Sequence, residues 1–182
     1  MNRALILLFI YFVLVGCAGK DHSVQIKRMY QKQISLDVIS DIDSLGKVPK
    51  VIVYHDSNQC STCQLGHISD WDEIIWHLDS LRPAIPVYFI ITPPQKRTKE
   101  IIQYLHNLKL QRYHITIDSL NLFSKHNPVI PADNLLHTFL LDRDNRIVLI
   151  GAPLFNTKLW SIYKNITQKM NDNNGLLPID LK

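Results

Sequence analysis

The sequence predicts an α/β protein in which a central mixed sheet is flanked by helices. Three observations carry this prediction: short apolar runs alternate with stretches of helical periodicity, two such runs flank a turn-forming cluster, and an amphipathic helix closes the pattern. The chain has 182 residues, of which 46% are hydrophobic and 20% are charged. These values fit one globular domain with its own core and exclude an intrinsically disordered chain.

Short runs rich in β-branched and aromatic residues predict the strands. The last two runs flank 142–145, an Asp-Arg-Asp-Asn cluster that favours the turn of a β-hairpin. Helical connections followed by a hairpin make the predicted sheet mixed. The predicted strands are Val51–Tyr54, Val87–Ile91, Tyr113–Ile117, Thr138–Leu141 and Arg146–Ile150, with Ile34–Leu36 as a candidate edge strand.

Apolar residues at helical spacing predict helices between these strands. The predicted helices are a long one over Cys60–Ser80, a second around Ile101–Leu108, a short one capped by Asp118 and running through Phe123, a last one opened by Asn156, and one or two turns over Ile26–Tyr30. The last helix places Leu159, Tyr163, Ile166 and Met170 on one face. The tail from Asn171 to Lys182 is expected to be loosely held.

Charge and cysteine content exclude several classes of function. The formal charge is only +4, and no run of Lys and Arg exceeds two residues, so nucleic acid is not an expected partner. Three cysteines are too few for a disulfide framework. No P-loop, GxGxxG or Ser/His/Asp pattern indicates nucleotide, dinucleotide or hydrolase chemistry. The basic cluster at Lys96, Arg97 and Lys99 is interpreted as a solvated helix start.

The first 16 residues are interpreted as an export signal rather than as part of the fold. One basic residue is their only charge, and the apolar run Ala4–Val15 is too short to span a membrane comfortably. A glycine precedes Cys17, and this arrangement resembles a bacterial lipobox, in which the cysteine is lipidated. An ordinary secretory signal is the alternative. We expect residues 1–16 to be a lipoprotein signal peptide and residues 17–47 to be a lipidated tether with an N-terminal extension, anchored to a membrane of the bacterial cell envelope.

The candidate site is the motif Cys60-Ser61-Thr62-Cys63, which follows a predicted strand and opens a predicted helix. Unpaired amide groups at a helix N-terminus stabilise a thiolate. The first cysteine is therefore expected to be exposed, with a lowered pKa, and the second to lie one turn further in, where it can close a disulfide. The alternatives are an inert disulfide on a domain that binds a partner, and a Cu(I) or Zn²⁺ site formed by Cys60, Cys63 and His137.

Two neighbouring features leave further alternatives open. His55 and Asp56, at the end of the first predicted strand, are candidates for proton transfer, although a turn in which Asp56 caps local amides is the simpler interpretation. The spacing Ser57-x-x-Cys60 resembles that of a peroxiredoxin, which adds peroxidase chemistry to the alternatives.

These motifs resemble the thioredoxin-like superfamily, most closely the membrane-anchored TlpA/ResA type of thiol-disulfide oxidoreductase. The resemblance rests on the strand before the CxxC, the CxxC that opens a helix, and the hairpin over Thr138–Val148. Together with the lipobox, it makes the chain similar to thioredoxin-like lipoproteins of Bacteroides-type bacteria. The resemblance implies a thioredoxin-like domain over residues 48–170, followed by a C-terminal tail over residues 171–182.

The resemblance also implies roles for individual residues. Cys60 would be the attacking thiolate and Cys63 the resolving one, forming a reversible disulfide, with protein thiols and disulfides of the envelope as partners and no cofactor. The expected neighbours of the pair are Gln59, Ser61, Thr62, Leu136 and His137.

The sequence departs from the family pattern close to the CxxC. Gln59 stands where the family usually has Trp, and Leu136 aligns with the cis-proline that lies against the cysteines. Tyr54 stands where thioredoxin itself has a buried Asp, and the Ser61-Thr62 dipeptide lacks the proline of many family members. These departures favour the alternative of a redox-inactive binding module.

Overall fold

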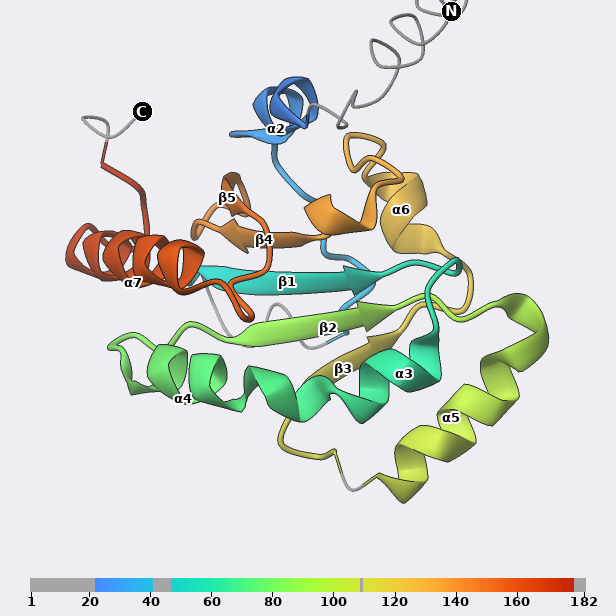
Figure 1. Cartoon of the computed structure of the whole chain (residues 1–182). Coiled ribbons are helices and arrows are strands. Elements are labelled where there is room, and N and C mark those ends of the chain that lie inside the picture. The colour runs from blue at the N-terminus through green and yellow to red at the C-terminus, as the bar shows by residue number, and fades with distance from the viewer. Residues whose placement is uncertain (1–21, 41–46, 109, 179–182) are drawn as a thin grey trace, which may run out of the picture.

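The computed structural model describes residues 22–40, 47–108 and 110–178 of the chain (Figure 1). The expected signal peptide over residues 1–16 and the expected lipidation site at Cys17 lie outside the described residues. Among the helices described, none is long and apolar enough to cross a membrane.

Five strands form one sheet in the order β3-β2-β1-β4-β5. Strands β1, β2 and β3 run parallel to one another, whereas β4 pairs antiparallel with both β1 and β5. This arrangement confirms the predicted fold class, a thioredoxin-like mixed sheet flanked by helices. The strands are β1 over Lys50–His55, β2 over Val87–Ile91, β3 over His114–Ile117, β4 over Thr138–Leu141 and β5 over Ile147–Ile150.

The helices follow the predicted order. They are α2 over Ser23–Met29, α3 over Ser61–Gly66, α4 over Asp72–Ser80, α5 over Thr98–Asn107, α6 over Leu122–His126 and α7 over Thr157–Asp172. The side chain of Asn156 accepts a hydrogen bond from Leu159 N at 2.9 Å and so caps α7 as predicted. Asp118 accepts from the backbone N–H of Leu122 and Phe123, at 2.8 Å each, so it caps a helix that begins and ends later than predicted.

The single long helix predicted over Cys60–Ser80 is wrong. A 3₁₀ turn over Ile68–Trp71 separates α3 from α4. The apolar residues Leu65, Ile68 and Trp71 recur every three positions, which is the period of a 3₁₀ helix, and all three are buried. Their common burial favours the tighter turn at this point.

The core lies on both faces of the sheet, and alternate strand residues supply it. Val51 and Val53 of β1 point to one face, with side chains of α4 and α7, whereas Ile52 and Tyr54 point to the other. There α6 and the N-terminal extension cover the sheet (Figure 1). Helices α3 and α5 pack together beside β3 through a smaller cluster centred on Ile101. Burial on both faces explains why β1 and β2 read as continuous apolar runs.

The N-terminal extension packs as part of the domain. Its helical turns are confirmed as α2, but the candidate edge strand at Ile34–Leu36 is wrong, because the extension makes only an isolated bridge between Gln33 and Arg146. Ile34 and Leu36 are buried. Between them, the backbone N–H of Ser35 donates to Oδ1 of Asn127 at 2.8 Å, and Nδ2 of Asn127 donates to the carbonyl oxygen of Ser35 at 3.0 Å. Hydrogen bonds to the Asn127 side chain thus take the place of the backbone hydrogen bonds that an edge strand would form with the sheet.

The tail from Asn171 is held as far as Leu177, contrary to expectation. Leu177 is buried in the core that α4 and α7 share. Gly175 has a φ of +79°, and a Cβ there would lie 3.0 Å from the Cβ of Arg143 and 3.1 Å from the Cδ of Pro49. A residue without a side chain is therefore required where the tail turns back onto the domain.

Candidate functional site

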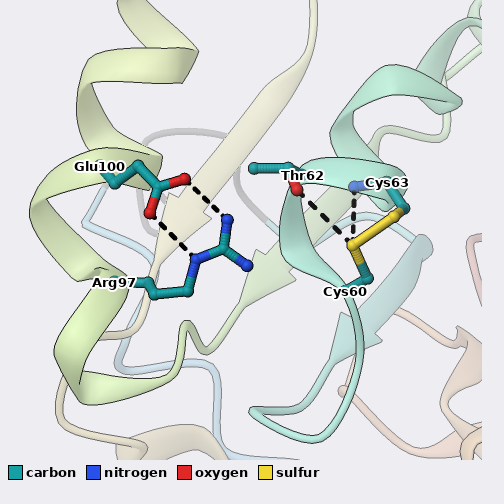
Figure 2. Close-up of a disulfide and its surroundings, with 5 residues drawn as sticks. All are labelled: Cys60, Thr62, Cys63, Arg97 and Glu100. Carbon is teal, nitrogen blue, oxygen red and sulfur yellow. Dashed lines mark hydrogen bonds and ion pairs between the residues drawn. A yellow bond between two sulfur atoms is a disulfide. The ribbon is translucent and has the colours of Figure 1, made fainter.

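The loop after β1 delivers the cysteine pair to the start of α3. Cys60 is the N-cap residue of α3 and forms a disulfide with Cys63, with the two Cα atoms 5.2 Å apart. The Sγ of Cys60 accepts a hydrogen bond from the backbone N–H of Cys63 at 3.4 Å, and the hydroxyl of Thr62 lies 3.5 Å from the same sulfur (Figure 2). Both groups can donate to a thiolate at this position.

Both cysteines are exposed: Cys60 as predicted, and also Cys63, which was predicted to lie one turn further in. The buried face of α3 carries Ser61 and Leu65, each 2% exposed. Residues four positions apart share a helix face, so Cys63, two positions from either, falls on the solvent side. The phase of the helix on its core therefore decides the accessibility of the second sulfur.

Gln59 connects the motif to the end of β1. Its side-chain oxygen lies 3.1 Å from Nδ1 of His55, and because an amide oxygen only accepts, the imidazole donates from Nδ1. Burial is the main cause that lowers the pKa of His55 to about 4; the nearby imidazole of His137 acts in the same direction, whereas the hydrogen bond to Gln59 and the carboxylate of Asp56 act against it. His55 is therefore neutral at pH 7 and adds no positive charge beside the sulfurs.

Asp56 performs the simpler of its two candidate roles. Its carboxylate accepts from the backbone N–H of Asn58 at 2.9 Å and stabilises the turn that leads to the motif.

Leu136 and His137 point into the core on the far face of the sheet. They are 4% and 2% exposed, and Leu136 packs in the cluster that holds Tyr54. His137 Nε2 lies 2.7 Å from the carbonyl oxygen of Pro131, and its ring packs against that of Tyr54 in a tilted arrangement, with centroids 4.9 Å apart. Its Nδ1 has no hydrogen-bond partner within the part of the chain described.

The alternative metal site is not assembled here. Residues 22–40, 47–108 and 110–178 contain no group of three His, Cys, Asp or Glu side chains placed to hold a metal ion. His137 is buried whereas Cys60 and Cys63 are exposed and bonded to each other, and the three do not form such a metal-binding group.

Tyr54 is a neutral residue near the end of β1, in the cluster that also holds Leu136. Its hydroxyl donates to Oδ1 of Asn121 at 3.2 Å, and its ring packs against Phe123 with centroids 5.0 Å apart. Burial is the main cause that raises the pKa of Tyr54 above its usual value. At neutral pH it cannot take the proton that a buried carboxylate would accept.

An ion pair that sequence reasoning did not connect to the cysteines lies across from them. Arg97, just before α5, donates two hydrogen bonds to the carboxylate of Glu100, at 2.7 and 3.0 Å, and the pair faces Thr62 (Figure 2). The basic cluster was visible in the sequence as a solvated helix start. Only the packing of α5 on α3 brings Arg97 of this cluster opposite the cysteine motif.

The chain combines a five-stranded mixed sheet with a cysteine pair of CxxC spacing at the start of a helix. No protein-family model matches the sequence, and no curated protein matches it significantly. Several solved structures are similar in fold. The C-terminal domain of a candidate thiol-disulfide oxidoreductase from Bacteroides thetaiotaomicron is 17% identical, with a TM-score of 0.49, 71% of this chain covered and 83% of that chain.

Two further solved structures have comparable scores. A candidate thiol:disulfide interchange protein DsbE from Chlorobium tepidum is 12% identical, with a TM-score of 0.48, covering 70% of this chain and 83% of that chain. The exposed lipoprotein thioredoxin Etrx1 from Streptococcus pneumoniae is 15% identical, with a TM-score of 0.46, covering 67% and 87%. At these values the likeness concerns the fold and carries no argument about activity or substrate.

Proposed function

We propose that this chain is a thiol-disulfide oxidoreductase of the bacterial cell envelope, tethered to a membrane through a lipid on Cys17. One observation carries the redox part: Cys60 and Cys63 are bonded to each other at the start of α3, and both are exposed. A structural disulfide gains nothing from exposure, whereas an exchanging one must be reached by a second thiol.

The reaction needs only the two cysteines and a partner. The Cys60 thiolate attacks one sulfur of the partner's disulfide, whose S–S bond breaks; a mixed disulfide forms, and the released partner thiolate takes up a proton. Cys63, having lost its proton to water, then attacks the Sγ of Cys60. The mixed disulfide breaks and the partner leaves with its second thiol. Two electrons pass to the partner, and the reverse sequence oxidises a dithiol.

Neighbouring groups support the first step. The N–H of Cys63 and the hydroxyl of Thr62 lie within reach of the Cys60 sulfur and can donate to the thiolate. His55 is held neutral, so stabilisation comes from hydrogen bonds rather than from an imidazolium charge.

The redox proposal is tested by thiol titration of the full chain carrying Cys17→Ser, which keeps only the pair. In graded glutathione buffers we expect a rapid, reversible two-thiol transition, counted by alkylation and intact mass. A pair that stays oxidised, or that reacts only after unfolding, contradicts the proposal. In cells, Cys63→Ser should accumulate a mixed disulfide through Cys60, whereas the matched Cys60→Ser variant should not.

The tether is tested separately. We expect the native chain to fractionate with membranes and to carry lipid on its N-terminal peptide, as measured by mass spectrometry, and Cys17→Ser to lose both. An exported, soluble chain with an unmodified cysteine would support the ordinary secretory signal instead.

A second candidate, a redox-inactive binding module, is favoured by the surroundings of the pair. Leu136 replaces the cis-proline and Tyr54 replaces the buried acid of the resembled family, so two groups that assist exchange there have no counterpart here. A Cys60→Ser, Cys63→Ser double variant that keeps full cellular function would support this candidate, and loss of function would count against it.

A further inference from the structure

A cavity of about 750 Å³ opens where the three parallel strands end. The loops that follow β1, β2 and β3 each supply part of its wall, because parallel neighbours end at the same edge of a sheet. Ligand sites of α/β proteins commonly lie at this edge, and the volume is within their usual range. The lining residues are Ser57, 92–97, 119–121 and Lys125.

The charge of this cavity is one-sided. Three cations line it, Lys96, Arg97 and Lys125, and no Asp or Glu is among the described residues of its wall. Arg97 is paired with Glu100. Lys96 and Lys125 form no ion pair within the described part of the chain, and the Nζ of Lys125 donates to the carbonyl oxygen of Leu120 at 2.8 Å. Two ammonium groups are therefore available to an anionic ligand.

The rest of the wall suits a peptide. Pro93, Pro94 and Leu120 supply apolar surface, and the Leu120 side chain is 65% exposed. Ser57 and Ser119 add hydroxyl groups that can donate or accept. A mixture of apolar surface, hydroxyls and unpaired cations matches a peptide that carries carboxylates.

The cavity adjoins the disulfide. Ser57 belongs to the short loop that leads to Cys60. On the other side Arg97 faces Thr62, whose hydroxyl is 3.5 Å from the Cys60 sulfur (Figure 2). A substrate with its cysteine on Cys60 therefore has neighbouring residues at the mouth of the cavity.

We propose that this cavity selects substrates whose reacting cysteine is flanked by acidic residues, with Lys96 and Lys125 binding their carboxylates. The proposal rests on the proposed function, because it names the class of substrate for the same cysteine pair. The solvated helix start that the sequence suggested is thereby assigned a role in substrate specificity.

The test compares disulfide-linked peptide homodimers that differ only in charge: Glu-Glu-Cys-Gly, Gln-Gln-Cys-Gly and Lys-Lys-Cys-Gly, with blocked ends. Each is reduced by the dithiol form of the full chain carrying Cys17→Ser, in nonionic detergent at low salt. Because intrinsic reactivity also varies with peptide charge, each rate constant is divided by that of dithiothreitol with the same peptide. We expect the acidic peptide to react roughly tenfold faster than the basic one, and salt to reduce this preference.

Charge reversal identifies the residues responsible. Lys96→Glu with Lys125→Glu should abolish or invert the preference. The matched control, Lys158→Glu with Lys169→Glu on α7, changes the net charge equally and should keep the preference. Equal normalised rates for all three peptides, or an equal loss in the control, would overturn the proposal.

Failure of the proposed function gives a different result. If no peptide reacts, the oxidised chain is titrated with the unreactive peptide Glu-Glu-Ser-Gly and followed by backbone NMR. Salt-sensitive shifts at Ser57, Gln95 and Ser119 that are absent from the Lys96, Lys125 variant support an acidic-peptide site on a binding module. No shifts there reject the site itself.

Discussion

Strand β1 carries a buried charge at one end and leads to an exposed disulfide at the other, and the two ends are built differently. At the first end Lys50 is only 2% exposed, and its Nζ donates to Oδ1 of Asn145 at 2.8 Å. Asp142 accepts from the backbone N–H of Asp144 and Arg146, at 2.9 Å each. The charge is thus enclosed by a turn in which Asp142 and Asn145 are hydrogen-bonded, although Nε of Arg143 in the same turn has no hydrogen-bond partner among the described residues.

At the other end polar groups are left open. The sulfurs of Cys60 and Cys63 face solvent, and the buried His137 Nδ1 is unbonded within the described residues. Unpaired buried polar groups cost stability, and native structures keep few of them. The hairpin end thus surrounds its buried charge with hydrogen-bonded side chains, whereas the disulfide end leaves the sulfurs accessible to solvent.

The largest effect is expected at the stable end. Asp142→Ala removes the acceptor of two backbone N–H groups and the negative charge that offsets burial of the Lys50 ammonium. We expect the free energy of unfolding to fall by roughly 3–5 kcal/mol in urea titrations. Asp144→Ala is the control, because its pairs with Arg143 and Arg146, at 3.9 and 3.5 Å, are half-exposed. It should cost less than about 1 kcal/mol, and equal losses would contradict the comparison.

A smaller effect is expected from His55. Burial lowers its pKa from 6.5 to about 4, so between these values the unfolded chain binds a proton that the folded chain does not. The contribution of His55 to the free energy of unfolding is therefore fully present above pH 6.5 and is lost as the pH falls toward 4. The loss amounts to about 3 kcal/mol, and this contribution does not change further at lower pH. Urea titrations at a series of pH values measure the slope of the free energy of unfolding against pH.

Two variants isolate the contribution of His55 to that slope. His55→Gln should remove most of it, whatever its effect on stability at pH 7, whereas His106→Gln, at an exposed position, should leave it unchanged. An unchanged slope in His55→Gln would show that the imidazole is not the group that resists protonation. His137 and Asp56 are the charged or titratable neighbours that act on it.

The smallest effect is expected from Tyr54→Phe. The hydroxyl donates a long hydrogen bond, at 3.2 Å, to Asn121, so its loss should cost about 1 kcal/mol. Because burial keeps Tyr54 neutral, the rate of thiol exchange between pH 7 and 9 should stay within about twofold. A large drop in that rate would mean that the phenol of Tyr54 takes part in proton transfer during thiol exchange at Cys60 and Cys63.

Much of the fold was predictable because its signals are local. Apolar runs mark β1 and β2, the Asp-Arg-Asp-Asn cluster marks the β4–β5 turn, and Asn156 marks the start of α7. The break between α3 and α4 was missed because a spacing of three fits a 3₁₀ helix and one edge of an α-helical stripe equally well. The held tail was missed because its turn depends on contacts of Gly175 with distant residues.

The candidate site divides in the same way. The sequence by itself determined that two cysteines three residues apart lie between a strand and a helix, which is close enough to pair. Tertiary structure alone decided that Cys63 faces solvent, that His137 is buried, and that Arg97 faces Thr62 of the cysteine motif. The physical reason is that these properties depend on the phase of one helix on its core and on the packing of segments distant in sequence. Neither leaves a local pattern in the chain.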